Sequence, residues 1–394
     1  PRWPVNTSVG FYDTRDSNPN RTKFASECGI WRDIVTTTTT INPKVRKAGG
    51  DCDEALEAIG QVFVGQRFVL RKLLAAAIGG GHVLFEDFPG LGKTLLVKTF
   101  SEVIGCDQNR VQFTPDLMPG DILGTNIWQP QAGEFSLIKG PIFTQILLAD
   151  EINRAPPKTQ AALLQAMEER VITIEGETYK LDQPFMVMAT QNPIEQEGTY
   201  PLPEAQLDRF MFKLSTGYPD SVDNEVEILS RRIKFSVADI SSAATKVFNR
   251  KKFVELQRLC RNEVHVDESI VRYIAQLVRG TRDHENAVVG SSPRGGVALL
   301  DSGKAMALIH GRDFVVPDDI KEVAIDALSH RVILHTEVIL DGVKEETVVK
   351  SVLDKVPVPV SLGDGQYEVV SDSDDTSEPS TDDSNESEDA ESQT

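Results

Sequence analysis

The sequence contains few cysteines, and their spacing does not match a disulfide framework or a zinc site. The 394 residues include four cysteines, at positions 28, 52, 106 and 260, and no two of them form a C-x-x-C pair. The six histidines show no H-E-x-x-H spacing. Isolated cysteines of this kind are typical of free thiols in a reducing compartment. We therefore expect no disulfide framework and no structural metal site.

Long apolar runs are also missing. No run approaches the roughly 18 residues that a membrane-spanning helix needs, and the first ten residues, PRWPVNTSVG, contain no apolar core of a signal peptide. With 40% apolar and 26% charged residues, the composition is that of a soluble globular protein, and the chain is long enough for two domains. We expect a cytoplasmic protein without a membrane span.

The sequence also has no excess of basic residues. The formal net charge is −19, and residues 356–394 hold twelve acidic residues and no Lys or Arg, which leaves 41 basic and 48 acidic residues before them. A protein whose main partner is a phosphate backbone usually presents a basic face. The charge balance therefore argues against nucleic acid as the main partner, although it leaves room for a local basic patch.

The two ends of the chain lack the apolar periodicity of folded segments. Residues 1–50 are polar and rich in Pro, Asn and Gly, and the stretch from Ser371 onward is acidic and of low complexity. Such segments bury too little apolar surface to become ordered alone. We expect a flexible N-terminal extension over residues 1–50 and a disordered acidic tail over residues 360–394, for which a solubilising role is favoured over docking.

Between these ends, short apolar runs alternate with helical patterns. The runs typical of buried strands are 82–86, 111–113, 146–150, 185–189 and 210–214. Strands that alternate with helices predict a mostly parallel sheet covered on both faces. After residue 218 only helical periodicity is evident. The sequence therefore predicts an α/β core over residues 51–218 and an all-helical domain over residues 219–359.

A glycine-rich turn in the stretch FEDFPGLGKT has the features of a phosphate-binding loop. Gly90 and Gly92 allow a tight turn whose N–H groups form an anion-binding nest at the start of a helix. Lys93 can then reach the β- and γ-phosphates, and Thr94 can offer its hydroxyl to Mg²⁺. Asp87 stands where the usual pattern G-x-x-x-x-G-K-[ST] has glycine, and its carboxylate would repel phosphates unless the side chain turns away. A plain strand-to-helix turn is the alternative for this stretch.

Two later strands end in polar residues that suit nucleotide hydrolysis. The run QILLADEINR ends in Asp150 and Glu151, which places two carboxylates at the carboxyl end of a strand, where open α/β sheets bind ligands. Asp150 is suited to hold Mg²⁺ through its waters, and Glu151 is suited to activate the attacking water as a general base. Asn192, at the end of MATQN, can orient the same water, although Asn before Pro is commonly a turn former.

With these segments in place, the sequence resembles the MoxR branch of the AAA+ ATPases from about residue 52 to residue 359. The resemblance rests on VGQ at residues 64–66, FEDFPGLGKT, LLADEINRAPPKTQ, LPEAQLDRF and SSPRGG. It implies a P-loop AAA+ core with a five-stranded parallel sheet, a helical lid, and ATP and Mg²⁺ as ligands. The residues that it implies for nucleotide binding are Gly65, Gln66, Pro89, Gly90, Leu91, Gly92, Lys93, Thr94 and Leu95.

The resemblance also implies catalytic roles. Lys93 and Thr94 look like the Walker A pair, Asp150 and Glu151 like the Walker B pair, and Asn192 like the sensor that positions water.

Two arginines receive roles only from the resemblance. Arg209 looks like the arginine finger that completes the site of a neighbouring subunit, and Arg294 looks like the sensor arginine that the lid brings to the γ-phosphate. Judged without the family, a surface pair between Arg209 and Asp208 is about equally reasonable, because exposed pairs are common and contribute little. Arg294 has a similarly ordinary alternative.

Two further stretches, residues 125–143 and the hairpin-like residues 171–185, resemble insertions that project from the ATPase core of this branch. Trp128 and Phe135 in the first of them are candidates for contact with a client, but we expect them to be buried by packing.

Together, the residues and the resemblance favour a Mg²⁺-dependent ATPase that works as a homo-oligomeric ring, expected to be a hexamer, and remodels or matures a protein partner. The family suggests partners with von Willebrand factor A domains. One alternative is a nucleic-acid motor or loader on the same core, which needs a basic track or a DNA-binding module that we do not find. Another is a switch that binds ATP and barely hydrolyses it, against which the presence of Glu151 argues.

Overall fold

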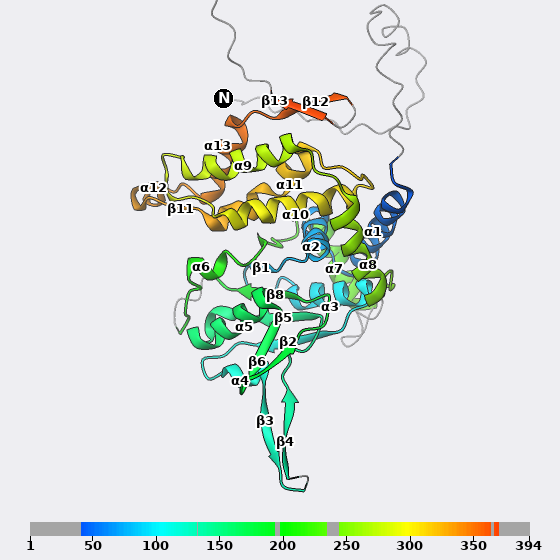
Figure 1. Cartoon of the computed structure of the whole chain (residues 1–394), viewed down its shortest axis with the longest axis vertical. Coiled ribbons are helices and arrows are strands. Elements are labelled where there is room, and N and C mark those ends of the chain that lie inside the picture. Colours follow the sequence, from blue (N-terminus) through cyan, green and yellow to red (C-terminus); the bar gives the residue numbers. More distant parts are fainter. Residues whose placement is uncertain (1–40, 132, 194–197, 235–243, 364–365, 370–394) are drawn as a thin grey trace, which may run out of the picture. The chain divides into compact units, whose positions relative to one another are not determined.

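The core of the protein is a single parallel sheet. The computed structural model describes residues 41–131, 133–193, 198–234, 244–363 and 366–369. The five strands of the sheet lie in the order β2 (Gln108–Gln112), β5 (Ile146–Asp150), β8 (Met186–Gln191), β1 (Val83–Glu86) and β9 (Phe212–Leu214). Every neighbouring pair is parallel, and the sheet lies below the helical region in Figure 1. The predicted five-stranded parallel α/β core is therefore confirmed.

The two faces of the sheet are buried by different elements. Alternate residues of a strand point to opposite faces. Phe85 and Leu148 belong to a core that includes α1 (Pro43–Val62), α2 (Arg67–Gly79) and α3 (Lys93–Ile104). Leu84 and Leu147 belong to a second core. The other members of that core include residues of the 3-10 helix η1 (Ile152–Arg154), α5 (Pro157–Glu169) and β6 (Val171–Ile174).

The first described helix begins several residues before the predicted start of the folded core at residue 51. Helix α1 begins at Pro43, where Asn42 caps it by accepting a hydrogen bond from the N–H of Lys44 at 3.0 Å. Val45 is fully buried, and Gly49 packs so tightly that an added Cβ would lie 2.6 Å from the Cα of Gly311. The predicted boundary of the flexible extension at residue 50 is therefore wrong, because polar and glycine residues in the first turns hide an apolar stripe. Residues 1–40 lie outside the described part of the chain.

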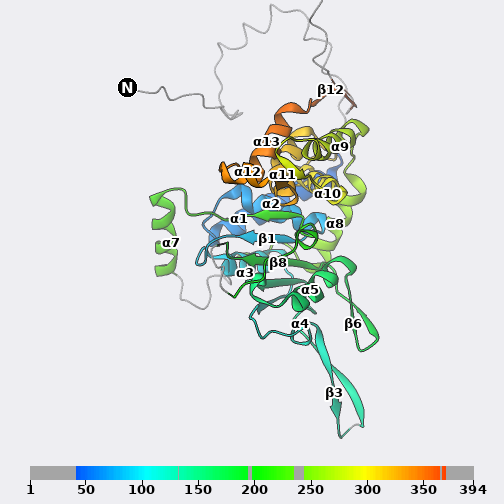
Figure 2. The same cartoon turned by 90° about the vertical axis from the view of Figure 1, so that its left-hand side faces the viewer.

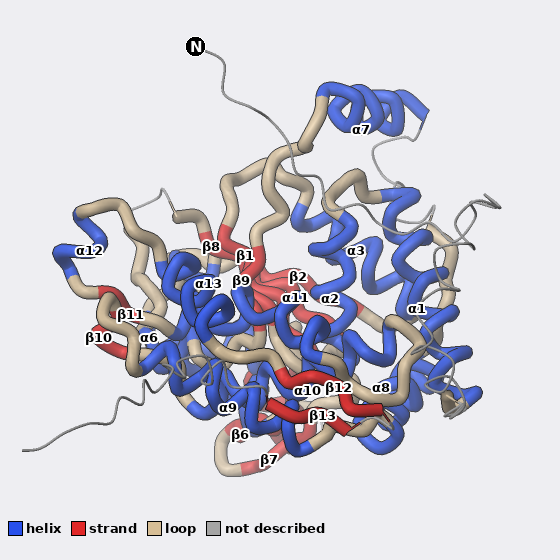
Figure 3. Tube along the Cα trace, turned by 90° about the horizontal axis from the view of Figure 1, so that it is seen from above, coloured by secondary structure: helices blue, strands red, loops and turns tan. Residues whose placement is uncertain are grey.

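Helices dominate the part of the chain that follows the sheet. They are α7 (Val222–Lys234), α8 (Arg250–Glu263), α9 (Glu268–Arg282), α10 (Pro293–Ile309), α11 (Pro317–Leu328), η3 (Ser329–Arg331), α12 (Thr336–Leu340) and α13 (Glu345–Lys355). Figures 2 and 3 show α7 standing apart from the other helices. Within the described residues, no helix is both long and apolar enough to cross a membrane.

Two short antiparallel pairs interrupt this helical region. Strand β10 (Ala287–Val289) pairs with β11 (Ile333–Leu334), and β12 (Pro359–Gly363) pairs with β13 (Gln366–Val369). The predicted helical region after the sheet is therefore confirmed, with the difference that it also carries these two strand pairs. The predicted start of the tail at residue 360 falls inside β12. The acidic stretch 370–394 lies outside the described residues.

Two hairpins extend from the core. One follows α4 (Pro119–Leu123) and consists of β3 (Gly124–Gln129) and β4 (Glu134–Lys139), whereas the other consists of β6 and β7 (Glu177–Lys180). The short helix α6 (Glu204–Leu207) precedes β9. Figures 1 and 2 show that the β3–β4 hairpin projects away from the sheet.

The aromatic pair on the β3–β4 hairpin is exposed. Trp128 lies opposite Phe135, edge to face, with ring centroids 5.2 Å apart. Their exposed fractions are 49% and 66%. The expectation that both rings are buried by packing is therefore wrong, because the hairpin that carries them projects away from the sheet.

Candidate functional site

The glycine-rich turn lies between the end of β1 and the start of α3. Gly90 has a φ of 86° and Gly92, the N-cap of α3, has a φ of 76°, both in the left-handed region that favours glycine. An added Cβ at Gly92 would lie 3.3 Å from the ring of Phe63. The free N–H groups of the first turn of α3 lie at the positive end of the helix dipole. The loop therefore has the backbone geometry of an anion-binding site.

Lys93 is folded back onto this loop. Its Nζ donates hydrogen bonds to the carbonyl oxygens of Asp87, at 3.0 Å, and Phe88, at 3.2 Å. Burial lowers the pKa of Lys93, and the charges of Asp87, Asp150 and Glu151 oppose that shift. A phosphate oxygen offers this ammonium group a stronger, charged acceptor than the two carbonyls do.

The side chain of Asp87 is turned into the protein. Its carboxylate accepts hydrogen bonds from Ser215 Oγ at 2.6 Å, from the N–H of Thr216 at 2.9 Å and from Thr216 Oγ1 at 3.0 Å. The residue is 4% exposed. Three donors thus hold the negative charge, which explains how an acid is accommodated in the loop.

The two acids at the end of β5 are held by a threonine on the neighbouring strand. Thr190 Oγ1 donates to Asp150 Oδ1 at 2.6 Å and accepts from the N–H of Glu151 at 2.8 Å. Glu151 has a φ of 57°, so the chain turns sharply directly after the strand. The sequence patterns did not identify Thr190, since its role depends on the register between β5 and β8, which pairs Ala149 with Ala189.

Further polar contacts to these acids come from β2 and from η1. Arg110 forms an ion pair with Asp150 Oδ2 at 2.7 Å. Gln112 donates to Glu151 Oε2 at 2.6 Å, and Arg154 Nε lies 3.0 Å from the same oxygen. Arg110 and Gln112 were also missed, because they lie on a strand whose sequence, QNRVQ, has no apolar pattern to mark its facing side.

These elements surround one cavity of about 350 Å³, which we call the phosphate-loop cavity. Its lining includes Pro89, Gly90, Leu91, Gly92, Lys93, Thr94, Asp150, Glu151 and Asn192. Predicted residues from three separate segments therefore meet in one place.

The residues of this cavity fit Mg²⁺ that arrives with a nucleotide. Among the described residues, no group of three or more His, Cys, Asp or Glu side chains is placed to hold a metal ion. Mg²⁺ commonly takes one or two protein oxygens and completes its shell with waters and substrate phosphates. Thr94 and Asp150 supply a hydroxyl and a carboxylate on the lining of the same cavity.

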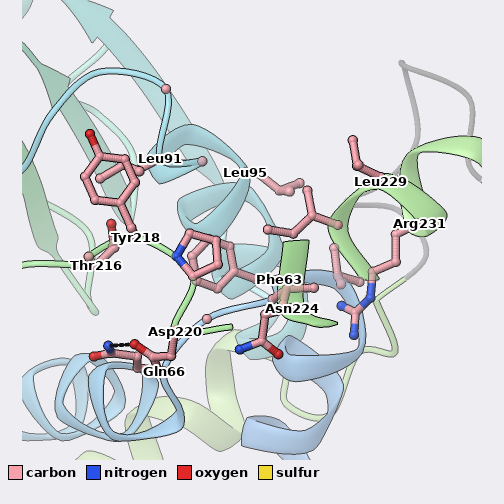
Figure 4. Close-up of a pocket in the computed structure, with 18 of the residues that line it drawn as sticks. Phe63, Gln66, Leu91, Leu95, Thr216, Tyr218, Asp220, Asn224, Leu229 and Arg231 are labelled. Carbon is pink, nitrogen blue, oxygen red and sulfur yellow. Dashed lines mark hydrogen bonds between the residues drawn. The ribbon is translucent and has the colours of Figure 1, made fainter. Parts of the chain in front are cut away.

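A second cavity, of about 380 Å³ and mainly apolar, adjoins the first at the loop, and we call it the apolar cavity. The two linings share Gly90, Leu91 and Gly92. Gly65, Gln66 and Leu95 line the apolar cavity together with Phe63, Tyr218, Leu229 and others. Figure 4 shows the side chains of Phe63, Leu95, Tyr218 and Leu229 around the space. The hydrogen bond of 2.7 Å from Gln66 Nε2 to Asp220 Oδ1 lies at its edge. Its size and apolar walls suit a planar base.

The two predicted arginines meet at a different place. Arg209 NH2 lies 3.0 Å from Glu168 Oε2, and Arg294 contacts the other oxygen of the same carboxylate. Asp208 instead pairs with Arg331 at 2.8 Å and accepts a hydrogen bond from Ser292 Oγ. The alternative expectation, a surface pair between Arg209 and Asp208, is therefore wrong.

These arginines line a third cavity, which we call the arginine cavity. Its volume is about 260 Å³, and its lining includes His82, Glu168, Arg170, Asp208, Arg209, Met211, Arg294 and Arg331. His82 directly precedes β1 and Met211 directly precedes β9, so this cavity lies at the amino ends of the two strands. The carboxyl end of β1 leads to the phosphate-loop cavity. Four residues of β1 separate the two ends by roughly 13 Å. The lid therefore does not bring Arg294 into the phosphate-loop cavity of its own chain.

Two family models match the chain. The model described as "ATPase family associated with various cellular activities (AAA)" matches residues 82–212, which hold the sheet from β1 to the start of β9. The model described as "AAA lid domain" matches residues 279–352, which hold the helices from the end of α9 into α13.

Similar proteins extend over most of the chain. The uncharacterized protein YeaC of Bacillus subtilis is 48% identical over 307 residues, which cover 78% of this chain and 94% of YeaC. Chaperone MoxR1 of Mycobacterium tuberculosis is 40% identical over 316 residues, covering 78% of this chain and 82% of MoxR1. A crystal structure of a suspected ATPase from Cytophaga hutchinsonii is 41% identical, with a TM-score of 0.74, and the match covers 80% of this chain and 97% of the other.

Proposed function

Because this chain belongs to the MoxR family of AAA ATPases, we propose that it hydrolyses ATP with Mg²⁺ in a homo-oligomeric ring and uses the energy to remodel or mature a protein partner. The observation that carries this proposal is the phosphate-loop cavity. There a lysine, a helix amino terminus and two strand-end acids face the same space. Such a set grips a triphosphate and activates water at its end.

The residues divide the chemistry among them. Lys93 and the N–H groups of the loop hold the β- and γ-phosphates, in exchange for the two carbonyl contacts of Lys93. Glu151 accepts the proton of the attacking water, and Asn192 orients that water. Mg²⁺, when bound by Thr94 and Asp150, neutralises charge on the phosphates.

The arginine cavity supports a shared site between subunits. Charge on the phosphoryl oxygens is stabilised by an added arginine, which can be worth about 10³ to 10⁵ in rate when supplied by a partner. Arg209 and Arg294 lie at the amino ends of the strands, away from their own phosphate-loop cavity. We therefore propose that both act on the nucleotide of a neighbouring copy, in a ring of six.

Turnover by the purified protein tests the ATPase proposal. Lys93→Ala removes the phosphate-binding cation, so turnover and ATP binding should both fall to near background. Glu151→Gln should abolish turnover and keep ATP binding. Lys98→Ala, on the exposed side of the same helix α3, is the matched control and should behave as wild type. Normal rates in both site variants would contradict the assignment.

Mixing variants tests the shared site. Arg209→Ala subunits retain Glu151, and Glu151→Gln subunits retain Arg209, so each supplies what the other lacks. Mixtures should recover part of the turnover that either variant loses alone. If no mixing ratio gives any recovery, the arginine does not act between subunits.

The partner that we propose is a protein rather than a nucleic acid. The exposed aromatic pair on the β3–β4 hairpin can bind an apolar peptide segment. A relative bears the name chaperone. The family suggests a partner with a domain of the von Willebrand factor A type. We propose the cytoplasm as the compartment. Trp128→Ala with Phe135→Ala should keep ATPase turnover and lose binding of such a domain. Stimulation of turnover by DNA or RNA at moderate salt would favour a nucleic-acid motor instead.

A further inference from the structure

The acid in the phosphate loop connects the two nucleotide cavities. We propose that Asp87 is a positioning residue that couples binding of the base in the apolar cavity to binding of the phosphates. The proposal rests on the proposed function in one respect, which is that a single nucleotide occupies both cavities. It assigns a role to a residue that departs from the usual phosphate-loop pattern.

The side chain of Asp87 reaches the segment after β9. Its two oxygens accept four hydrogen bonds from Ser215 and Thr216: one of 2.6 Å from the serine hydroxyl, two of 2.9 and 3.1 Å from the Thr216 N–H, and one of 3.0 Å from the Thr216 hydroxyl. Hydrogen bonds to an ionised carboxylate are stronger than neutral ones. Because the residue is 4% exposed, water does not weaken these contacts.

That segment forms one wall of the apolar cavity. Residues 216–220 all line it, and Asp220 accepts the hydrogen bond from Gln66 on the opposite side. Figure 4 shows Thr216 and Tyr218 near Leu91 of the loop, with Asp220 and Gln66 at the far edge. The wall is therefore tied at one end to the phosphate loop and at the other end to the start of α2.

The main chain of Asp87 faces the phosphate side. Its carbonyl oxygen accepts a hydrogen bond from Lys93 Nζ, the group that turns to the phosphates when they bind. One residue thus contacts the phosphate-binding lysine through its backbone and the base-cavity wall through its side chain. Phosphates that draw Lys93 away from this carbonyl and a base that moves the cavity wall therefore both act on Asp87.

Glycine is not required at this position for the backbone to follow its path. Among the described residues other than glycine, a positive φ occurs at Glu151, Arg170 and Glu175, and Asp87 is not among them. The loop conformation can therefore form with either glycine or aspartate. What aspartate adds is the set of bonds to Ser215 and Thr216.

Replacing Asp87 by glycine gives a sharp test, because it restores the usual pattern. Binding of ATP and of inorganic tripolyphosphate, which lacks the base, is measured for the full chain by titration calorimetry with Mg²⁺. In Asp87→Gly, we expect ATP affinity to fall by about tenfold, within the usual range of coupling between sites. Tripolyphosphate affinity should change less than about twofold. This probe leaves the apolar cavity empty, so the coupling between the two cavities does not contribute to its binding. In turnover, KM for ATP should rise while kcat stays close to wild type.

Two further variants protect the test against a folding defect. Ser215→Ala removes one donor and leaves the backbone bond, so it should shift the ATP-to-tripolyphosphate ratio in the same direction by less. Asp182→Asn, an exposed acid that pairs with Arg250 at the surface, should leave the ratio unchanged. Thermal melting of each variant establishes that the comparison is between folded proteins.

The outcomes are distinguishable. An Asp87→Gly protein that binds ATP as well as wild type would overturn the proposal. An equal loss of affinity for ATP and tripolyphosphate would also overturn it, because the residue would then serve only the shape of the phosphate loop. Wild-type protein that fails to bind ATP would overturn the proposed function and this inference together, before any variant is compared.

Discussion

The two ends of the central sheet carry opposite chemistry. At the carboxyl ends of the strands, Asp150 and Glu151 are held by Thr190 and face a single lysine across the phosphate-loop cavity. At the amino ends, Arg209 and Arg294 share the carboxylate of Glu168. The first region has the phosphate loop and the paired acids that we propose for ATP hydrolysis, but no arginine on its lining. The second has arginines but no phosphate loop, so each region supplies what the other lacks.

The carboxylate of Glu168 pairs with both arginines at the amino end of the sheet. Both arginines are paired with one acid in the single chain, so their charge is already partly neutralised. A γ-phosphate of a neighbouring chain would have to compete with Glu168 for them. If these arginines act on a neighbour's nucleotide, as we propose, their release from Glu168 must accompany the docking of that neighbour.

The largest effect that tests this comparison should come from Arg209. Replacing it by alanine removes the charge offered to the neighbour's phosphate, and we expect kcat to fall by about 10³ or more with ATP binding retained. Steady-state turnover and calorimetric binding measure the two quantities. A variant that loses ATP affinity in proportion to kcat would place this arginine at its own chain's site instead.

A second prediction concerns how the lid is fixed to the amino end of the sheet. Arg331 is nearly buried and pairs with Asp208, and its guanidinium also donates to the carbonyl of Phe210 at 2.7 Å. Arg331→Ala leaves a partly buried carboxylate without its cation, so we expect a loss of about 3 to 5 kcal/mol in the free energy of unfolding. Denaturant titration measures it. The exposed pair of Arg279 with Asp283 is the control, and Arg279→Ala should cost less than about 1 kcal/mol.

At the carboxyl end of the sheet, replacing Thr190 should reduce turnover less than replacing Arg209, but by a measurable amount. Thr190→Val keeps the volume and removes the hydroxyl that orients both acids, and such supporting contacts are typically worth about 10- to 100-fold in metal affinity or activity. We expect the Mg²⁺ concentration for half-maximal turnover to rise. Thr173→Val, on the exposed β6–β7 hairpin, is the matched control. An unchanged Mg²⁺ dependence would show that the acids are oriented without Thr190.

The smallest expected effect belongs to Glu168. Glu168→Gln removes the acid that competes for the arginines, and because these side chains are partly exposed, the gain in turnover should be no more than about fivefold. Glu169→Gln, whose carboxylate accepts from Gln165 on the same helix, should have no effect. A fall in turnover would mean that Glu168 orients the arginines toward the neighbour rather than holding them back.

The sequence was sufficient to predict the parts of the fold that apolar runs mark. The strands around Leu84, Leu148 and Met188 were placed within a few residues, because parallel strands buried on both faces read as continuous apolar runs. Helix α1 was missed from Pro43 to Gly50, where its buried positions alternate with Lys, Arg and Gly. Gly49 packs closely on Gly311, so a glycine suits that helix position. A sequence pattern of apolar residues does not reveal this contact.

For the candidate site, the sequence pointed to residues that lie within one motif and gave no sign of contacts between motifs. Lys93 and Glu151 were recognised from their own segments. The direction of the Asp87 side chain was not predictable, because its donors, Ser215 and Thr216, are more than 120 positions away and meet it only through the pairing of β1 with β9. Thr190 was hidden for the same reason. Register between parallel strands decides such contacts, and the motif around Asp87 does not show which residues of a distant strand lie beside it.

The apolar core that joins α1 and α2 to α10 and α11 limits where this molecule can bend. Side chains such as Leu73, Phe85 and Ile320 belong to one continuous buried cluster, which runs from the sheet into the helices that follow it. A swing of those helices away from the sheet would expose this cluster to water, at roughly 25 cal/mol for each Å² of apolar surface. We therefore expect the sheet and these helices to move as one body in any conformational change.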